Sequence, residues 1–224
     1  MRPKAAPGVD GVTWQAYEGN LSANLEDLHR RLRGRCYHAP PVRRAWIEKE
    51  DGRRRPLGIP TLEDKIVQRS VAMLLEAVYE PLFHDFSYGF RPGRSAHQAL
   101  DRLRTQCLTQ NIQWIVDADV CGYFDNIDHG HLRAFLKRKV NDGALLRLIG
   151  KWLNAGVLEE GKLWRPDAGT PQGGVISPIL ANVYLHYVLD VWFERDVVPR
   201  MKRQCGLVRY ADDFVMVFED FLDC

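Results

Sequence analysis

The chain has 224 residues, of which 46% are hydrophobic and 27% are charged, with 12 prolines and 18 glycines. This composition is typical of a globular protein and excludes the collagenous and intrinsically disordered classes. The five cysteines are widely spaced and form no Cys-x-x-Cys pair, which argues against a zinc site or a disulfide framework and favours a reducing compartment. No apolar run approaches the ~20 residues that span a bilayer, and the N-terminus lacks a secretion signal. We therefore expect a cytoplasmic protein with no membrane partner.

Positive charge is concentrated between Arg30 and Arg55. This stretch contains ten basic and three acidic residues, a net charge of +7, whereas the whole chain carries +2. A local positive field on a near-neutral protein is typical of a surface that binds polyphosphate. A solvated helix face followed by a basic loop would give the same pattern, and charge alone does not separate the two interpretations.

The first half of the chain is predicted to contain three helices and one hairpin. The patterns indicate a helix through the twenties that ends near residue 34, a β-hairpin over 44–59, and helices that begin at 61 and 95. Leucines at helical spacing predict the first helix. Asp51-Gly52 between two extended segments predicts the hairpin turn, and Thr61 and Ser95 are of the residue types that cap helices.

The second half is predicted to mix short strands with helices. The patterns indicate a strand over 114–120, helices over 128–136, 145–153 and 177–192, and two apolar strands over 207–210 and 214–218. Ser177-Pro178 combines an N-cap residue with proline at the first helical position, which predicts where the last helix begins. The whole pattern indicates a mixed α/β chain whose antiparallel strands carry helices on one face.

Two acidic sites interrupt the apolar strands. Side chains alternate along a strand, so Asp117 and Asp119 should point to the same face. Asp212 and Asp213 lie between the last two strands, where an Asp pair is often only a polar turn. Carboxylates that lie close together repel unless a cation binds them, and two Mg²⁺ ions held ~3.5–4 Å apart catalyse in-line phosphoryl transfer. The two acidic sites could build such a centre if their strands are neighbours in one sheet, which the sequence alone does not show.

Six short blocks follow one another in the order found in reverse transcriptases. They are Pro7–Gly11, Arg55–Pro60, Tyr88–Ser95, Asp119–Ile127, Gly169–Pro178 and Tyr210–Asp213. A single Tyr-x-Asp-Asp would be weak support, but six blocks in order are specific. The complete N-terminal block and the Tyr-Gly-Phe-Arg-Pro run are similar to the group II intron-encoded reverse transcriptase/maturase family. CRISPR-associated reverse transcriptases share these blocks and remain an alternative.

The resemblance implies a right-hand polymerase fold of the α/β (α+β) class, with an antiparallel palm sheet backed by helices and mostly helical fingers. The resemblance implies four divisions of the chain. Residues 1–113 would form the fingers with the N-terminal extension block, and residues 114–130 the palm strand with the first metal ligand. Residues 131–165 would form helices and a hairpin of fingers and palm, and residues 166–224 the palm with the nucleotide pocket and the Tyr-Ala-Asp-Asp hairpin. The blocks stop before the position of a thumb, so we expect the thumb to be absent.

The resemblance also implies which residues are catalytic. Asp119 and Asp212 align with the first two metal ligands, Asp213 aligns with a third acid, and the backbone carbonyl of Val120 is expected to touch a metal. The expected cofactors are two Mg²⁺ ions, for which Mn²⁺ is a possible substitute. Asp117 has no invariant counterpart in the family and is expected to be a polar neighbour.

Six residues are expected to bind the nucleotide: Lys49, Arg55, Phe124, Pro171, Gln172 and Gly173. Lys49 and Arg55 would hold the triphosphate, because arginine offers a planar fork and lysine a point charge. One of the two arginines before Arg55 is the alternative. Phe124 would clash with a 2′-hydroxyl below the incoming sugar, and Gly173 would let the backbone approach the substrate. An ordinary core aromatic and a surface turn are the alternatives for these two positions.

Template and primer contacts are expected from Tyr88, Phe90, Arg91, Arg94 and Tyr210. A basic and aromatic loop can hold phosphates and stack bases. A packing role for the two aromatic residues of the loop is an equal alternative.

The activity that the resemblance implies is RNA-directed DNA synthesis, in which a primer 3′-hydroxyl attacks the α-phosphate of a dNTP. The expected partners are an RNA template, a DNA or RNA primer, dNTPs and an intron RNA whose splicing the protein would assist. An RNA-binding maturase role without polymerisation and a CRISPR-associated or domesticated reverse transcriptase are the alternatives.

Overall fold

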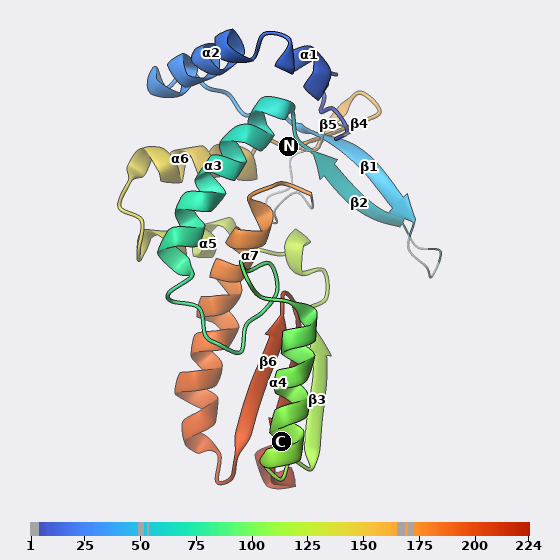
Figure 1. Cartoon of the computed structure of the whole chain (residues 1–224), viewed down its shortest axis with the longest axis vertical. Coiled ribbons are helices and arrows are strands. Elements are labelled where there is room, and N and C mark those ends of the chain that lie inside the picture. The colour runs from blue at the N-terminus through green and yellow to red at the C-terminus, as the bar shows by residue number, and fades with distance from the viewer. Residues whose placement is uncertain (1–4, 49–51, 53, 165–168, 170–172) are drawn as a thin grey trace. The chain divides into compact units, whose positions relative to one another are not determined.

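The computed structural model describes residues 5–48, 52, 54–164, 169 and 173–224. The chain mixes helices and sheets, which confirms the predicted α/β class (Figure 1). It divides into two compact units that interleave along the sequence: the first unit contains Met1–Met73, Phe124–His129 and Val140–Ser177, and the second contains Leu74–Tyr123, Gly130–Lys139 and Pro178–Cys224. Residues 74–113, which were expected with the fingers, thus share a unit with the sheet that carries the aspartates. The predicted boundaries of fingers and palm otherwise stay predictions.

The first unit is built on a four-stranded sheet and four helices. The strands lie in the order β2-β1-β4-β5, with bounds Arg54–Ile59 for β2, Val42–Glu48 for β1, Val157–Glu159 for β4 and Lys162–Trp164 for β5. The helices are α1 (Trp14–Glu18), α2 (Leu21–Arg33), the first part of α3 (Leu62–Tyr79) and α6 (Gly143–Leu153). β1 and β2 pair in antiparallel fashion, which confirms the predicted hairpin.

Asp64 on α3 is a buried acid in the core of this unit. It accepts hydrogen bonds from the Tyr37 hydroxyl, in the loop after α2, and from Trp152 Nε1 of α6 at 3.3 Å. Burial raises the pKa of Asp64 to about 7. The carboxyl group therefore joins three segments that are distant in sequence.

The second unit contains a three-stranded antiparallel sheet in the order β3-β7-β6. Its bounds are Trp114–Asp119 for β3, Asp213–Phe218 for β7 and Cys205–Tyr210 for β6. Its helical elements are α4 (Ala96–Thr109), most of α5 (His129–Lys137) and most of α7 (Ser177–Leu185). Ser95 caps α4 in a capping box with Gln98, as its residue type predicts.

Helices cover both faces of this sheet, so the expectation of helices on one face is wrong. Val208 of β6 packs with Ala99 and Leu103 of α4, which lies along the sheet in Figure 1. The next residue, Arg209, points to the opposite face and binds Asp190, in the helical segment after α7. A charged residue inside an apolar strand needs a polar partner on the covering helix, and Asp190 supplies it.

The helical run that begins at Ser177 is longer and less regular than predicted. After α7 it continues through two π-helical stretches, His186–Asp190 and Phe193–Val197. Such stretches are rare and frequently occur at functional sites. The first of them carries the buried His186 and Asp190. Among the helices of the described residues, none is long and apolar enough to cross a membrane.

Candidate active site

The two acidic sites meet on neighbouring strands. Asp119, the last residue of β3, is the direct partner of Asp213, the first residue of β7. Residues directly opposite each other in an antiparallel pair project to the same face, with Cβ atoms about 4.5–5.5 Å apart. The structure therefore confirms that folding brings the acid of the Trp114 strand beside the pair at the hairpin.

These carboxylates influence one another electrostatically. Asp117, Asp119 and Asp213 are exposed on one face, and Asp212 is half-buried. Partial burial raises the pKa of Asp213, and the charges of Asp212, Asp119 and Asp117 raise it further. Anionic oxygen groups gathered in this way attract a hard divalent cation such as Mg²⁺. The chemistry of the donors thus fits the expected metal.

The positions of the carboxylates do not yet form a complete ligand set. In the parts of the chain that the structure describes, no three His, Cys, Asp or Glu side chains converge closely enough to hold one metal ion. Like charges repel, which favours side-chain rotamers that spread neighbouring carboxylates. The structure shows acids within electrostatic range of one another, and the role of each as a ligand stays a prediction.

The tip of the hairpin has an unusual backbone. Tyr210 pairs with Asp213, so Ala211 and Asp212 alone form the turn. Ala211 is buried and has a φ of +59°, a left-handed conformation that costs a residue with a Cβ atom about 1–2 kcal/mol. Backbone strain of this kind persists only where the surroundings hold it in place, and it is concentrated at active sites.

The segment around Tyr88 is one of those surroundings. The Tyr88 backbone N–H donates to the carbonyl of Arg209 at 2.8 Å. A Cβ atom on Gly89 would lie 2.2 Å from the backbone nitrogen of Ala211, so only glycine fits there. The side-chain amide of Asn182 on α7 donates to the Gly89 carbonyl at 2.8 Å. Three segments that are distant in sequence thus meet at the tip of the hairpin.

Arg209 fixes the hairpin from the other face of the sheet. Its side chain is 0% exposed and forms a bidentate pair with Asp190, also 0% exposed, with Nε–Oδ1 and Nη2–Oδ2 distances of 2.7 and 2.6 Å. Its Nη1 donates to Asn182 Oδ1 at 3.1 Å and to the carbonyl of Ala211 at 2.9 Å. This network was not predicted from the sequence patterns. The available signal was an arginine within the apolar run from Leu207 to Tyr210.

Residues 47–222 match the family described as reverse transcriptase (RNA-dependent DNA polymerase). The chain belongs to this family. It is 36% identical over 239 residues to Protein YkfC of Escherichia coli (strain K12), covering 94% of this chain and 63% of that protein. It is 41% identical over 198 residues to the group II intron-encoded protein LtrA of Lactococcus lactis subsp. cremoris, covering 85% of this chain and 33% of LtrA.

Among solved structures, a Candida albicans telomerase in complex with telomeric RNA superimposes with a TM-score of 0.63 at 15% identity. That match covers 93% of this chain and 41% of the telomerase, and it shows that the right-hand fold is shared. The relatives confirm the predicted group II intron type. Enzymes of this family use divalent metal ions. This reverse transcriptase chain spans less than two thirds of either relative's length.

The predicted template residues of the reverse transcriptase have different surroundings. Arg91 is buried, and its guanidinium donates to Glu80 at 2.8 Å and to the carbonyls of His84 and Ser87 at 2.7 and 2.6 Å. Because its donors are directed to protein acceptors, Arg91 braces the loop, and the expectation that it touches the template needs correction. The pattern of basic and aromatic residues did not reveal its partner Glu80.

The other four predicted template residues divide into two pairs. Tyr88 is buried beneath the guanidinium of Arg94, whose Cζ lies 5.3 Å from the ring centroid, and Arg94 pairs with Asp85 at 2.7 Å. Phe90 is 51% exposed with a φ of +58°, and Tyr210 is 39% exposed. Their exposed rings can stack on bases. Template contact by all four residues stays a prediction.

Of the predicted nucleotide residues, Lys49, Pro171 and Gln172 lie outside the described residues. Arg55 is exposed on β2 opposite Ile47. The other two predicted residues, Phe124 and Gly173, belong like Arg55 to the first unit.

Glycines hold these blocks of the first unit together. Gly173 has a φ of +105°, and a Cβ atom on it would lie 2.8 Å from the Gly58 carbonyl of β2. Gly169, with a φ of +91°, packs in the same way on the backbone carbonyl of the buried Phe124, at 2.8 Å, and donates its N–H to Ile127 at 2.8 Å. The two glycine contacts fix Gly173 against the second of the six blocks and Gly169 against the fourth.

Much of the basic stretch from Arg30 to Arg55 is neutralised within the protein. Arg31 pairs with Glu63 at 2.8 Å, and Arg44 lies 3.8 Å from Glu159. The Arg43 guanidinium donates to the Pro7 carbonyl at 2.9 Å. These three arginines are half-buried and bound to protein acceptors, so they fit neither a solvated face nor a free polyphosphate-binding surface.

Proposed function

We propose that this chain carries the polymerising centre of a group II intron-type reverse transcriptase, which copies an RNA template into DNA. The observation that carries the proposal is the register that sets Asp119 opposite Asp213, within a chain of this family. The reaction joins a primer 3′-hydroxyl to the α-phosphate of a dNTP and releases pyrophosphate. An RNA template, a DNA or RNA primer and dNTPs are the proposed partners.

The proposed metal ligands are Asp119, Asp212, Asp213 and the backbone carbonyl of Val120, with two Mg²⁺ ions, or Mn²⁺ as a substitute. Bound ions of this kind activate the attacking hydroxyl and stabilise charge on the leaving oxygen. The protein's part is positioning, because a carboxylate is useful only where the backbone holds it. Arg209 supplies that constraint at the turn through its contact with the Ala211 carbonyl.

The proposed nucleotide residues complete the assignment. Arg55 and Lys49 would hold the triphosphate, and Phe124 would select deoxynucleotides through its ring. Pro171, Gln172 and Gly173 would line the pocket in which the base and sugar lie. Support for these roles comes from the matched sequence blocks and from the contact between Gly173 and Gly58.

Primer extension with matched aspartate variants tests the proposal. Asp119→Asn and Asp212→Asn in the longest natural form of the protein should each lower the rate at least about a hundredfold. Asp117→Asn is the matched control, because Asp117 lies on the same face two residues away and the substitution removes the same charge. It should keep the rate within about fivefold of the parent. Equal losses at Asp117 and Asp119 would mean that the general negative field, and not a specific ligand, matters.

A second proposed role is binding of an intron RNA to assist splicing. It is supported by intron-encoded relatives. RNA binding and splicing by the Asp212→Asn variant should persist when polymerisation is lost. We also propose a cytoplasmic location, since all five cysteines are free thiols.

A further inference from the structure

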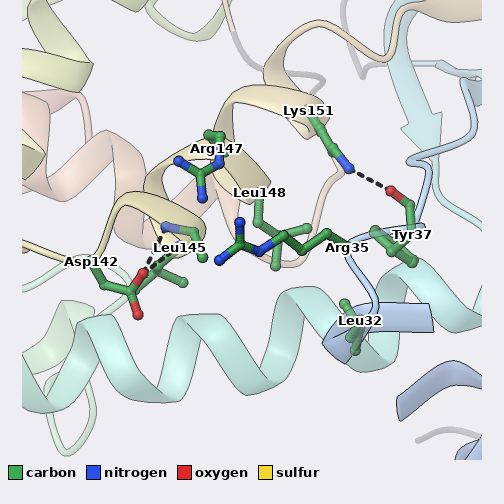
Figure 2. A pocket seen from close by; sticks show the side chains of 9 residues that line it. Leu32, Arg35, Tyr37, Asp142, Leu145, Arg147, Leu148 and Lys151 are labelled. Atoms are coloured by element: carbon green, nitrogen blue, oxygen red, sulfur yellow. Dashed lines mark hydrogen bonds between the residues drawn. The ribbon is translucent and has the colours of Figure 1, made fainter. Parts of the chain in front are cut away.

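A pocket of about 430 Å³ lies in the first unit, between the end of α2 and one side of α6. Its lining combines an apolar floor with cationic walls and consists of Leu32, Arg35, Tyr37, Asp142, Ala144, Leu145, Arg147, Leu148 and Lys151. Figure 2 shows that the pocket is formed by the segment after α2 on one side and by α6 on the other. It contains none of the residues assigned above to metal, nucleotide or template.

Arg35 enters this pocket from a strained backbone position. The N–H groups of Arg35 and Cys36 donate to the carbonyls of Leu32 and Arg31, which is the Schellman arrangement that ends a helix. The arrangement places one residue in the left-handed region, a position that glycine usually occupies. Here Arg35 occupies it with a φ of +59°, although Gly34 is its immediate neighbour. An arginine kept where glycine would be more stable indicates a function for its side chain.

The second cation is Arg147. Its side chain extends from α6 into the same pocket as Arg35 (Figure 2). Within the described part of the chain, neither guanidinium has a hydrogen-bond partner or an ion pair within 4.0 Å. Asp142 lines the same pocket: its Oδ1 accepts from the N–H groups of Ala144 at 2.7 Å and Leu145 at 3.1 Å, and these bonds together with the charge of Arg147 lower its pKa. Asp142 thus offsets part of the charge of Arg147.

The remaining lining residues fix the shape of the pocket. Lys151 Nζ donates to the Tyr37 carbonyl at 2.5 Å, which ties α6 to the segment after α2. Leu32, Leu145 and Leu148 are half-buried and form an apolar floor. Two arginines above an apolar floor suit a ligand that has both an anionic group and a flat apolar group.

We propose that this pocket binds one unpaired nucleotide of an RNA strand, with the phosphate at Arg35 and Arg147 and the base against Leu32, Leu145 and Leu148. The proposal rests on the proposed function in one respect, namely that RNA is a partner of the chain. Guanidinium forks match phosphate oxygens in a bidentate manner, and their planes also stack on the splayed bases of single-stranded RNA. The three leucines would add apolar contact with the base. An acidic peptide without an apolar side chain would satisfy the arginines but would leave the apolar floor unused.

Arg35→Gly tests the proposal, because it separates binding from folding. Glycine relieves the left-handed strain, so the variant should unfold at the same or a higher temperature than the parent. Its affinity for a short fluorescein-labelled single-stranded RNA, measured by anisotropy with saturating primer–template duplex present, should fall about tenfold. The salt dependence should become shallower by about 0.7 in log–log slope for the lost phosphate contact.

Two further variants complete the test. Arg33→Gln removes the same charge from an exposed site outside the pocket and should change affinity by less than about twofold. Ala144→Glu adds a carboxylate at the rim, at a helix N-terminal position that tolerates one, and should weaken binding as Arg35→Gly does. Unchanged RNA affinity of Arg35→Gly, or an equal loss with Arg33→Gln, would overturn the proposal.

Asp212→Asn separates this inference from the proposed polymerase. That variant should lose primer extension and keep its affinity for RNA at the pocket. If it retains extension, the polymerase assignment fails while the pocket measurement still stands. If it loses extension and Arg35→Gly binds RNA normally, the pocket assignment alone fails.

Discussion

The buried pair of Arg209 and Asp190 allows a direct test of how the hairpin that carries Asp212 and Asp213 is held. Arg209 makes four hydrogen bonds, two of them to Asp190, and both side chains are 0% exposed. Asp190→Leu would leave a buried guanidinium without its counter-charge, which costs about 3–5 kcal/mol. For a chain of this size that corresponds to a fall in Tm of roughly 6–20 °C.

The double variant Asp190→Leu with Arg209→Met separates stability from positioning. Apolar residues of similar volume in place of a buried pair commonly restore stability, so Tm should recover most of the loss. Primer extension should stay at least about tenfold below the parent, because the Ala211 carbonyl has lost its donor and the turn can shift. The measurements are thermal unfolding and single-turnover extension. Full activity in the refolded double variant would show that the pair does not position the hairpin.

Three other outcomes follow from the structure. Asp64 has a raised pKa of about 7, so the stability that its protonated form provides is fully present below the unfolded pKa of about 3.9 and is lost as pH rises through about 7. In urea unfolding, Asp64→Asn should therefore be more stable than the parent by roughly 2–4 kcal/mol at about pH 8. Below about pH 4 the two proteins should be equally stable. Burial lowers the pKa of His186 to about 4, so the free energy of unfolding should fall by about 3 kcal/mol as pH drops from about 6.5 to 4. In the same assay, His186→Phe should reduce this dependence of the unfolding free energy on pH. Gly89→Ala should reduce primer extension, because its Cβ would lie 2.2 Å from the Ala211 nitrogen; Gly150→Ala, which meets nothing within 4 Å, is the control and should stabilise α6 by about 0.5–1 kcal/mol.

Elements that depend on local chemistry were predictable from the sequence. Ser95 with Gln98 three residues later is a capping box, and α4 begins where that pattern indicates. The Asp-Gly turn predicted the hairpin of β1 and β2. In each case neighbouring residues decide the backbone conformation, so no information about distant segments is needed.

Features that depend on distant partners were not predictable. The role of Arg91 was misjudged because its acceptor Glu80 lies eleven residues away, and a basic loop looks the same whether its arginines are paired or free. The π-helical stretch around Asp190 has no sequence signature of its own. Its geometry brings a carboxylate to Arg209, nineteen residues further along the chain. Such features depend on tertiary contacts, and a sequence pattern gives no distance between residues that are far apart along the chain.

The buried pair also explains how the register of the carboxylates is specified. A slip of one residue in a strand moves every side chain to the opposite face. If β6 slipped, Arg209 would leave Asp190 and be buried without a counter-charge, at a cost of several kcal/mol. The two-residue turn couples β6 to β7, so the register that satisfies Arg209 is also the one that sets Asp213 opposite Asp119. A slip would cost less with an apolar pair in place of Arg209 and Asp190. A charged pair that adds little net stability can therefore still specify the register that brings the carboxylates of β3 and β7 together.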